Sequence, residues 1–137
     1  ERYEIFYNPY KKFTIVRNPY TRAISEYFFR ERNVTTFDND QFLRWWQTFT
    51  YSNCDHFLSQ STYFEDINYD YVIRYENLEQ EFNDMCKEEG VPEGLPHMNK
   101  SRIDTCSCVP LLTKESVEFI NNLYIEDCTK FNYKLLP

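Results

Sequence analysis

One short segment of the chain carries two side chains that could bind an anion. The run of apolar and β-branched residues at 13–16 predicts a strand that ends at Arg17, and Pro19 suits the first position of a helix. Ser25 then lies in the second turn of that helix. A guanidinium matches two phosphate oxygens with a rigid fork of donors, and a hydroxyl adds one donor without a further charge. The segment therefore predicts a phosphate site.

The helix after Pro19 has an apolar stripe, and Ser25 lies outside it. The stripe consists of Ala23, Ile24, Tyr27 and Phe28, with the spacing i, i+1, i+4, i+5. A plainer interpretation is a surface helix with an Arg22–Glu26 pair, in which Arg17 merely ends the strand. Spacing alone leaves both interpretations open.

Two strand–helix units must position these groups. The first combines a strand at 12–17 with a helix at 19–32, and the second a strand at 69–75 with a helix that starts at 76 and ends near Gly90. Two such units in series imply a parallel pair within an α/β sheet. Loops are expected at 33–37, 51–68 and 91–112.

Two further helices follow from capping residues and apolar spacing. Asp38 or Asp40 could cap a helix to about residue 49, and Thr113 could cap the last helix. Their expected apolar stripes are Phe42, Trp45, Trp46 and Phe49 in the first, and Val117, Ile120, Leu123 and Tyr124 in the second.

Composition limits the classes of function. The 137 residues suit a single domain, and the net charge of −7 disfavours nucleic acid as a partner. No apolar stretch approaches the ~18 residues of a membrane span. The chain has two glycines, Gly90 and Gly94, and so has no Gly-rich phosphate loop. A P-loop kinase is also disfavoured, because no Walker lysine is present.

The segment with Arg17 and Ser25 resembles the 3′-phosphate-binding motif of sulfotransferases that use 3′-phosphoadenosine 5′-phosphosulfate (PAPS). Four later segments resemble carbohydrate sulfotransferases of the chondroitin and heparan type, and they occur in the same order along the chain. They are the loop with Asp55, His56, Phe57 and Gln60, the strand and turn at 71–78, the loop at 97–101, and the closing set Tyr124, Asp127, Phe131 and Tyr133. Together the resemblance covers residues 12–134.

The resemblance implies a P-loop NTPase-like three-layer α/β sandwich with a parallel sheet. In that family a Gly-rich loop near the N-terminus holds the 5′-phosphosulfate. Because the sequence lacks such a loop and starts at Glu1, we expect an N-terminally truncated single domain at 1–137, without the first strand and loop. Related enzymes are often Golgi membrane glycoproteins. A Golgi location is therefore expected if the protein is eukaryotic and anchored, and a cytoplasmic one otherwise.

The implied activity is transfer of a sulfuryl group from PAPS to a carbohydrate hydroxyl, which releases 3′,5′-ADP and requires no metal. Arg17 and Ser25 would bind the 3′-phosphate. Lys100, Ser101 and Arg102 would add contacts from a late loop, or else form a solvated basic turn. His56 could be the base that accepts the hydroxyl proton, or a packed loop histidine. Gln60 could contact substrate or hold the loop.

The tandem tryptophans raise a different possibility. Trp45, Trp46 and Tyr51 could stack on sugar rings in a non-catalytic carbohydrate-binding module, although helical spacing with Phe42 and Phe49 favours core positions. Asn33 and Asn99 begin glycosylation sequons, and a glycan on Asn99 would obstruct a cofactor loop there.

The five cysteines allow several interpretations. Cys54 and His56 with Cys106 and Cys108 could form a zinc site, but the one-residue gaps are shorter than usual. One or two disulfides are favoured, and Cys86 is expected to be a buried thiol. A stapled or zinc-stabilised interaction domain is the third alternative.

Overall fold

Two short parallel strands position the segment that contains Arg17 and Ser25. The structure is a computed structural model and describes residues 10–49, 55–96 and 103–137. Strand β1 (Phe13–Val16) pairs with β2 (Tyr71–Arg74) in parallel, with Phe13 opposite Tyr71 and Val16 opposite Arg74. The predicted parallel pair is thus confirmed. Both strands are shorter than predicted: β1 does not include residues 12 and 17, and β2 does not include residues 69, 70 and 75. Tyr75 already begins a 3₁₀ helix.

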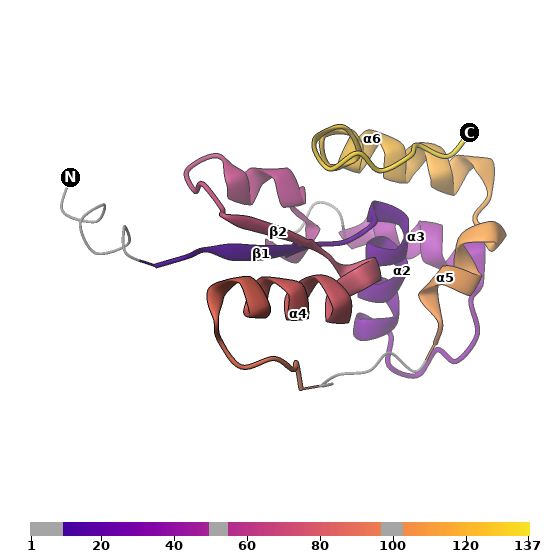
Figure 1. Ribbon diagram of the computed structural model, residues 1–137. Coiled ribbons are helices and arrows are strands. Elements are labelled where there is room, and N and C mark those ends of the chain that lie inside the picture. Colours follow the sequence, from indigo (N-terminus) through magenta and orange to yellow (C-terminus); the bar gives the residue numbers. More distant parts are fainter. Residues whose placement is uncertain (1–9, 50–54, 97–102) are drawn as a thin grey trace.

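Helices surround this pair on both sides, as Figure 1 shows. The strand β1 leads into α2 (Pro19–Arg30), and β2 leads through a 3₁₀ turn into α4 (Leu78–Glu89). In Figure 1, α4 lies on one side of the strands and α6 (Lys114–Lys130) on the other. The helix α3 (Asn39–Phe49) packs against α2, as does α6. The chain is therefore an α/β protein with a parallel sheet, as the sequence predicts.

The loops at 51–68 and 91–112 contain helical turns that the sequence does not predict. The first holds 3₁₀ helices at Asp55–Phe57 (η1) and Gln60–Phe64 (η2), and the second holds α5 (Thr105–Cys108) and η4 (Val109–Leu111). These elements span three to five residues, which is too short for an apolar period. They matter because α5 and η2 both contact Arg17.

The predicted helix ends are confirmed by their capping contacts. The side chain of Asn18 caps α2 and Pro19 occupies the first turn. Asp38, rather than Asp40, caps α3 by accepting from a backbone N–H at 2.8 Å. Thr113 caps α6, and Gly90 ends α4 in the left-handed conformation with a φ of 65°.

An aromatic core joins α2, α3 and α6. Trp46 is 1% exposed and Trp45 is 9% exposed. The Trp45 indole also donates to Glu31 at 2.9 Å. The alternative of an aromatic sugar-binding surface is therefore wrong for both tryptophans, because the helical spacing directs them into the core. Tyr51, the third residue of that alternative, lies outside the described residues. The core cluster comprises Tyr20, Ala23, Ile24, Tyr27, Phe42, Trp45, Trp46, Phe57, Cys108, Val117, Ile120 and Tyr124.

The cysteines of the described ranges are free thiols. Cys86, Cys108 and Cys128 are buried and Cys106 is exposed, and these four form no disulfide with one another. The expectation of a buried Cys86 is confirmed, while Cys54 lies outside the described residues. Within the same ranges no group of three or more potential metal ligands occurs, and no helix is long and apolar enough to cross a bilayer.

Candidate functional site

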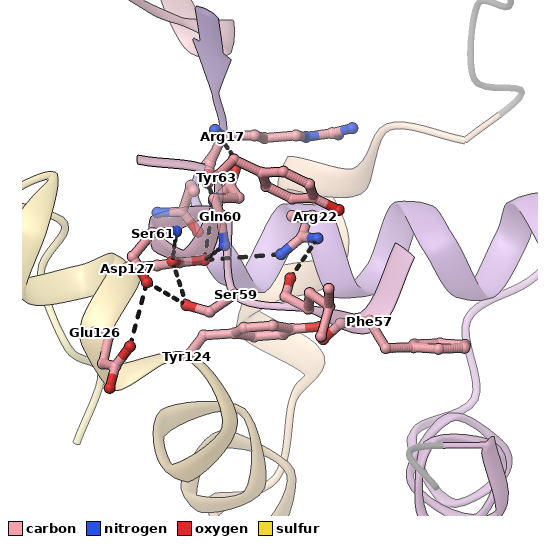
Figure 2. A network of polar contacts seen from close by, with 12 residues as sticks. Arg17, Arg22, Phe57, Ser59, Gln60, Ser61, Tyr63, Tyr124, Glu126 and Asp127 are labelled. Carbon is pink, nitrogen blue, oxygen red and sulfur yellow. Dashed lines mark hydrogen bonds and ion pairs between the residues drawn. The ribbon is translucent and has the colours of Figure 1, made fainter. Parts of the chain in front are cut away.

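The Arg17 side chain extends from the end of β1 and contacts two threonines. Its Nε donates to the Thr21 hydroxyl of α2 at 3.3 Å, and its Nη2 donates to the Thr105 hydroxyl of α5 at 2.8 Å. The Tyr75 ring lies against the guanidinium, 4.2 Å from Cζ. In Figure 2 this side chain points away from the polar network around Asp127. Three separate segments thus meet at one guanidinium.

The guanidinium has donors that the described residues leave unused. It has five N–H groups, and two of them bond to Thr21 and Thr105. The other three have no acceptor among residues 10–49, 55–96 and 103–137. Burial lowers the pKa of Arg17 from its ordinary value, an effect that the Tyr75 and Glu76 side chains oppose. The guanidinium nevertheless stays charged at neutral pH, because the ordinary pKa of arginine lies far above neutral pH.

Ser25 lies on the same face of α2 as Thr21. The two residues are one helical turn apart, which places their Cβ atoms about 5–6 Å from each other. Since Thr21 bonds to the Arg17 guanidinium, Ser25 lies on the side of α2 that faces this cation. Ser25 is partly buried, and its hydroxyl makes no hydrogen bond with the described parts of the chain. Ser25 therefore shares a helical face with the threonine that bonds to Arg17.

The alternative Arg22–Glu26 pair is not what the structure shows. Arg22 turns to the buried Asp127, with 3.7 Å between Nη1 and a carboxylate oxygen, and donates to the carbonyls of His56 and Leu58. Glu26 pairs with other partners. The plainer interpretation, a surface helix with an Arg22–Glu26 pair, is therefore wrong for Arg22. This side chain instead connects α2 to the η1 loop and to α6.

One ring nitrogen of His56, Nδ1, contacts a carboxylate, and Nε2 has no partner among the described residues. Its Nδ1 lies 3.3 Å from the Glu26 carboxylate, which also pairs with Arg30 at 2.8 Å. The imidazole stacks on Phe29, with ring centroids 6.4 Å apart and planes within 9° of parallel. The His56 side chain is 56% exposed. Because a carboxylate can only accept, a hydrogen bond here requires the proton on Nδ1, and in a neutral ring with this tautomer Nε2 is the acceptor.

Gln60 contacts the backbone of Arg17. Its Oε1 accepts from the Arg17 N–H at 2.8 Å, and its Nε2 donates to the Arg17 carbonyl at 2.9 Å. Of the two predicted roles, holding the loop is the one these contacts show.

Three contributors to the site were missed from sequence. Thr21 lies four residues after Arg17, which was a usable signal on a predicted helix. Tyr75 belongs to the recognised segment at 71–78. Thr105 comes from a stretch predicted as loop and is 88 residues from Arg17, so no local pattern indicates it. The predicted cofactor contacts Lys100, Ser101 and Arg102 lie outside the described residues, as does His97.

Comparison with known proteins identifies the family. The family model described as "Sulfotransferase family" matches residues 2–134, nearly the whole chain. Neither the curated proteins nor the solved structures compared with the chain give a match. The match agrees with the order of the sequence motifs and with an α/β fold that presents an arginine after a parallel strand. The chain belongs to the sulfotransferase family.

Proposed function

We propose that this chain binds the 3′-phosphate of PAPS through Arg17 and Ser25, in an enzyme that transfers a sulfuryl group to a carbohydrate hydroxyl. The supporting observation is the Arg17 guanidinium, which sits at the end of β1 with three N–H donors unused by the described residues. Ser25 adds a hydroxyl on the same helical face. A dianionic phosphate with several acceptor oxygens fits this donor set.

The remaining donors suit a phosphate better than a carboxylate or a neutral group. A tetrahedral phosphate can accept from the two Nη groups of Arg17 and from the Ser25 hydroxyl at different oxygens. Thr21 and Thr105 already restrain the guanidinium, so little side-chain freedom is lost on binding. Lys100, Ser101 and Arg102 are proposed to add contacts to the same nucleotide.

His56 is the proposed general base. PAPS supplies an activated sulfuryl group, and its acceptor is a hydroxyl whose proton must be removed. His56 can take that proton at Nε2, because Glu26 holds Nδ1–H at 3.3 Å and fixes the tautomer. The stacking contact with Phe29 limits rotation of the ring. The carbohydrate class of the acceptor is inferred from the resemblance at 55–60 and 124–133.

Nucleotide discrimination tests the binding part of this proposal. We expect the full chain to bind 3′,5′-ADP at least about tenfold more tightly than 5′-AMP in titration calorimetry, because a charged hydrogen bond contributes roughly 1.5–3 kcal/mol. Equal affinities for the two nucleotides would show that the 3′-phosphate is not recognised.

A pH–rate profile tests the role of His56. With labelled PAPS and a panel of desulfated glycosaminoglycans, His56→Ala is expected to lower kcat by about 10²–10⁴-fold. The dissociation constant for 3′,5′-ADP should stay unchanged, because His56 is proposed to act on the acceptor and not on the nucleotide. An unaltered kcat, or an unaltered acidic limb of the profile, would remove His56 from the mechanism.

A further inference from the structure

The Gln60 side chain holds the backbone of Arg17, the residue that follows β1. The Gln60 amide accepts from the Arg17 N–H at 2.8 Å and donates to the Arg17 carbonyl at 2.9 Å. These are the two hydrogen bonds that a residue of a neighbouring strand would supply. Gln60 begins η2 and lies 43 residues from Arg17, so this contact fixes the point where the chain leaves the sheet.

Asp127 of α6 in turn holds Gln60. One carboxylate oxygen accepts from the Gln60 backbone N–H at 2.9 Å and from its side-chain Nε2 at 3.2 Å. The other oxygen accepts from the Ser61 N–H at 2.7 Å and from the Ser59 hydroxyl. Figure 2 shows these contacts converging on Asp127 beneath Gln60. A single carboxylate thus orders the whole start of η2.

The Asp127 carboxylate is fully buried, which makes its position specific. It is 0% exposed, and the cation that faces it is Arg22, 3.7 Å away. Burying a charge is costly unless donors surround it, and a satisfied buried network favours one geometry. Arg22 belongs to α2, the helix that also carries Ser25. Asp127 therefore fixes the η2 loop and α2 relative to each other.

We propose that Gln60 and Asp127 are positioning residues for the anion site: Asp127 orients the Gln60 amide, and the amide holds the Arg17 backbone so that the guanidinium points at the phosphate. This inference rests on the proposed function, since it assumes that Arg17 binds the 3′-phosphate. Neither residue touches the nucleotide, and both act through Arg17.

Gln60→Met removes the amide while keeping a side chain of similar length. The variant is expected to bind 3′,5′-ADP about three- to ten-fold more weakly, the effect of one lost neutral hydrogen bond or a little more. Binding of 5′-AMP should not change, because that nucleotide lacks the phosphate that Arg17 contacts. Gln47→Met, at an exposed position of α3, is the matched control and should bind like the wild type.

A double-mutant cycle separates positioning from a general structural role. If Gln60 acts through Arg17, Gln60→Met costs no further affinity in an Arg17→Ala background. Additive losses, or an equal loss of 5′-AMP binding, would overturn the proposal. So would wild-type affinity in Gln60→Met when Arg17→Ala binds weakly. If Arg17→Ala itself binds 3′,5′-ADP normally, the proposed function fails first.

Asp127→Asn adds a second, stricter variant. An amide cannot accept at both positions, so its N–H₂ group would face either the Gln60 donors or the Ser61 N–H. We expect a loss for 3′,5′-ADP at least as large as in Gln60→Met, at a temperature where circular dichroism shows a folded chain. Gln60→Met carries the test if Asp127→Asn does not fold. Unchanged affinity in a folded Asp127→Asn chain would contradict the proposal.

Discussion

Replacing Arg17 by alanine is expected to weaken the binding of 3′,5′-ADP by at least tenfold. The described residues leave three N–H groups of the guanidinium unpaired, and a phosphate can accept from two of them. One lost charge-assisted hydrogen bond costs about 1.5–3 kcal/mol, or roughly 10- to 150-fold in affinity. The alanine variant should therefore lose most of the preference for 3′,5′-ADP over 5′-AMP.

The same change also removes contacts within the protein. Arg17 bonds to Thr105 at 2.8 Å and, at the longer distance of 3.3 Å, to Thr21, and it stacks on Tyr75. A hydrogen bond from a charged donor is worth about 1.5–3 kcal/mol and an exposed cation–π contact about 0.5–1 kcal/mol. The unfolding free energy should thus fall by about 2–4 kcal/mol, so titrations must be run well below the unfolding transition of the variant.

Two further variants isolate the geometry of the guanidinium. Arg17→Lys keeps the charge but loses the planar fork, and its affinity should lie between the wild type and Arg17→Ala. Arg44→Ala removes the same charge from an exposed position on α3 and should bind both nucleotides like the wild type. If Arg44→Ala weakened binding as much as Arg17→Ala, the loss would reflect net charge alone. The assignment of the phosphate to Arg17 would then be refuted.

Three other outcomes are expected. Ser25→Ala should weaken 3′,5′-ADP binding about fivefold without affecting 5′-AMP, because one neutral donor to the phosphate is lost; equal losses for both nucleotides would contradict this. Cys106 is exposed and directly follows Thr105, which bonds to Arg17, so 3′,5′-ADP should slow its alkylation, as measured by peptide mass analysis, with buried Cys86 as the internal reference; an unchanged rate would place the nucleotide elsewhere. Burial raises the pKa of Tyr124 above its ordinary 10.0, so the folded state keeps this proton more tightly and stability should fall as the pH rises above about 10. Tyr124→Phe, which loses the bond to the Phe57 carbonyl, should be less stable near pH 7 but decline less steeply in alkaline thermal melts; parallel curves would refute this.

Local sequence patterns predicted the strands, the four long helices and their caps, because each depends on neighbouring residues. Pro19, Asp38, Thr113 and Gly90 mark helix ends through short-range contacts with the backbone. The apolar spacing likewise placed Trp46 in the core. These features need no knowledge of the distant chain.

The parts that could not be predicted depend on long-range pairing. Thr105 reaches Arg17 across 88 residues, and Asp127 reaches Gln60 across 67. Asp127 was recognised as part of a closing motif, but nothing local shows that its carboxylate is buried under a loop. Arg22 likewise pairs with the distant Asp127, whereas the plainer interpretation of the helix expected a partner one turn away.

The acidic composition of the chain does not conflict with an anionic ligand. The net charge is −7, yet Arg17 faces two threonines and a tyrosine ring rather than a carboxylate within hydrogen-bonding distance. By contrast, Arg22 and Arg30 each pair with a carboxylate. The proposed phosphate recognition would depend on this local difference and not on the overall charge.

A crystal structure of the full chain with 3′,5′-ADP measures the central claim most directly. We expect the 3′-phosphate oxygens to lie about 2.7–3.0 Å from the Arg17 Nη atoms and within hydrogen-bonding distance of Ser25 Oγ. The Thr21 and Thr105 contacts of the guanidinium should persist. A 3′-phosphate bound elsewhere, with Arg17 and Ser25 contacting solvent, would contradict the assignment.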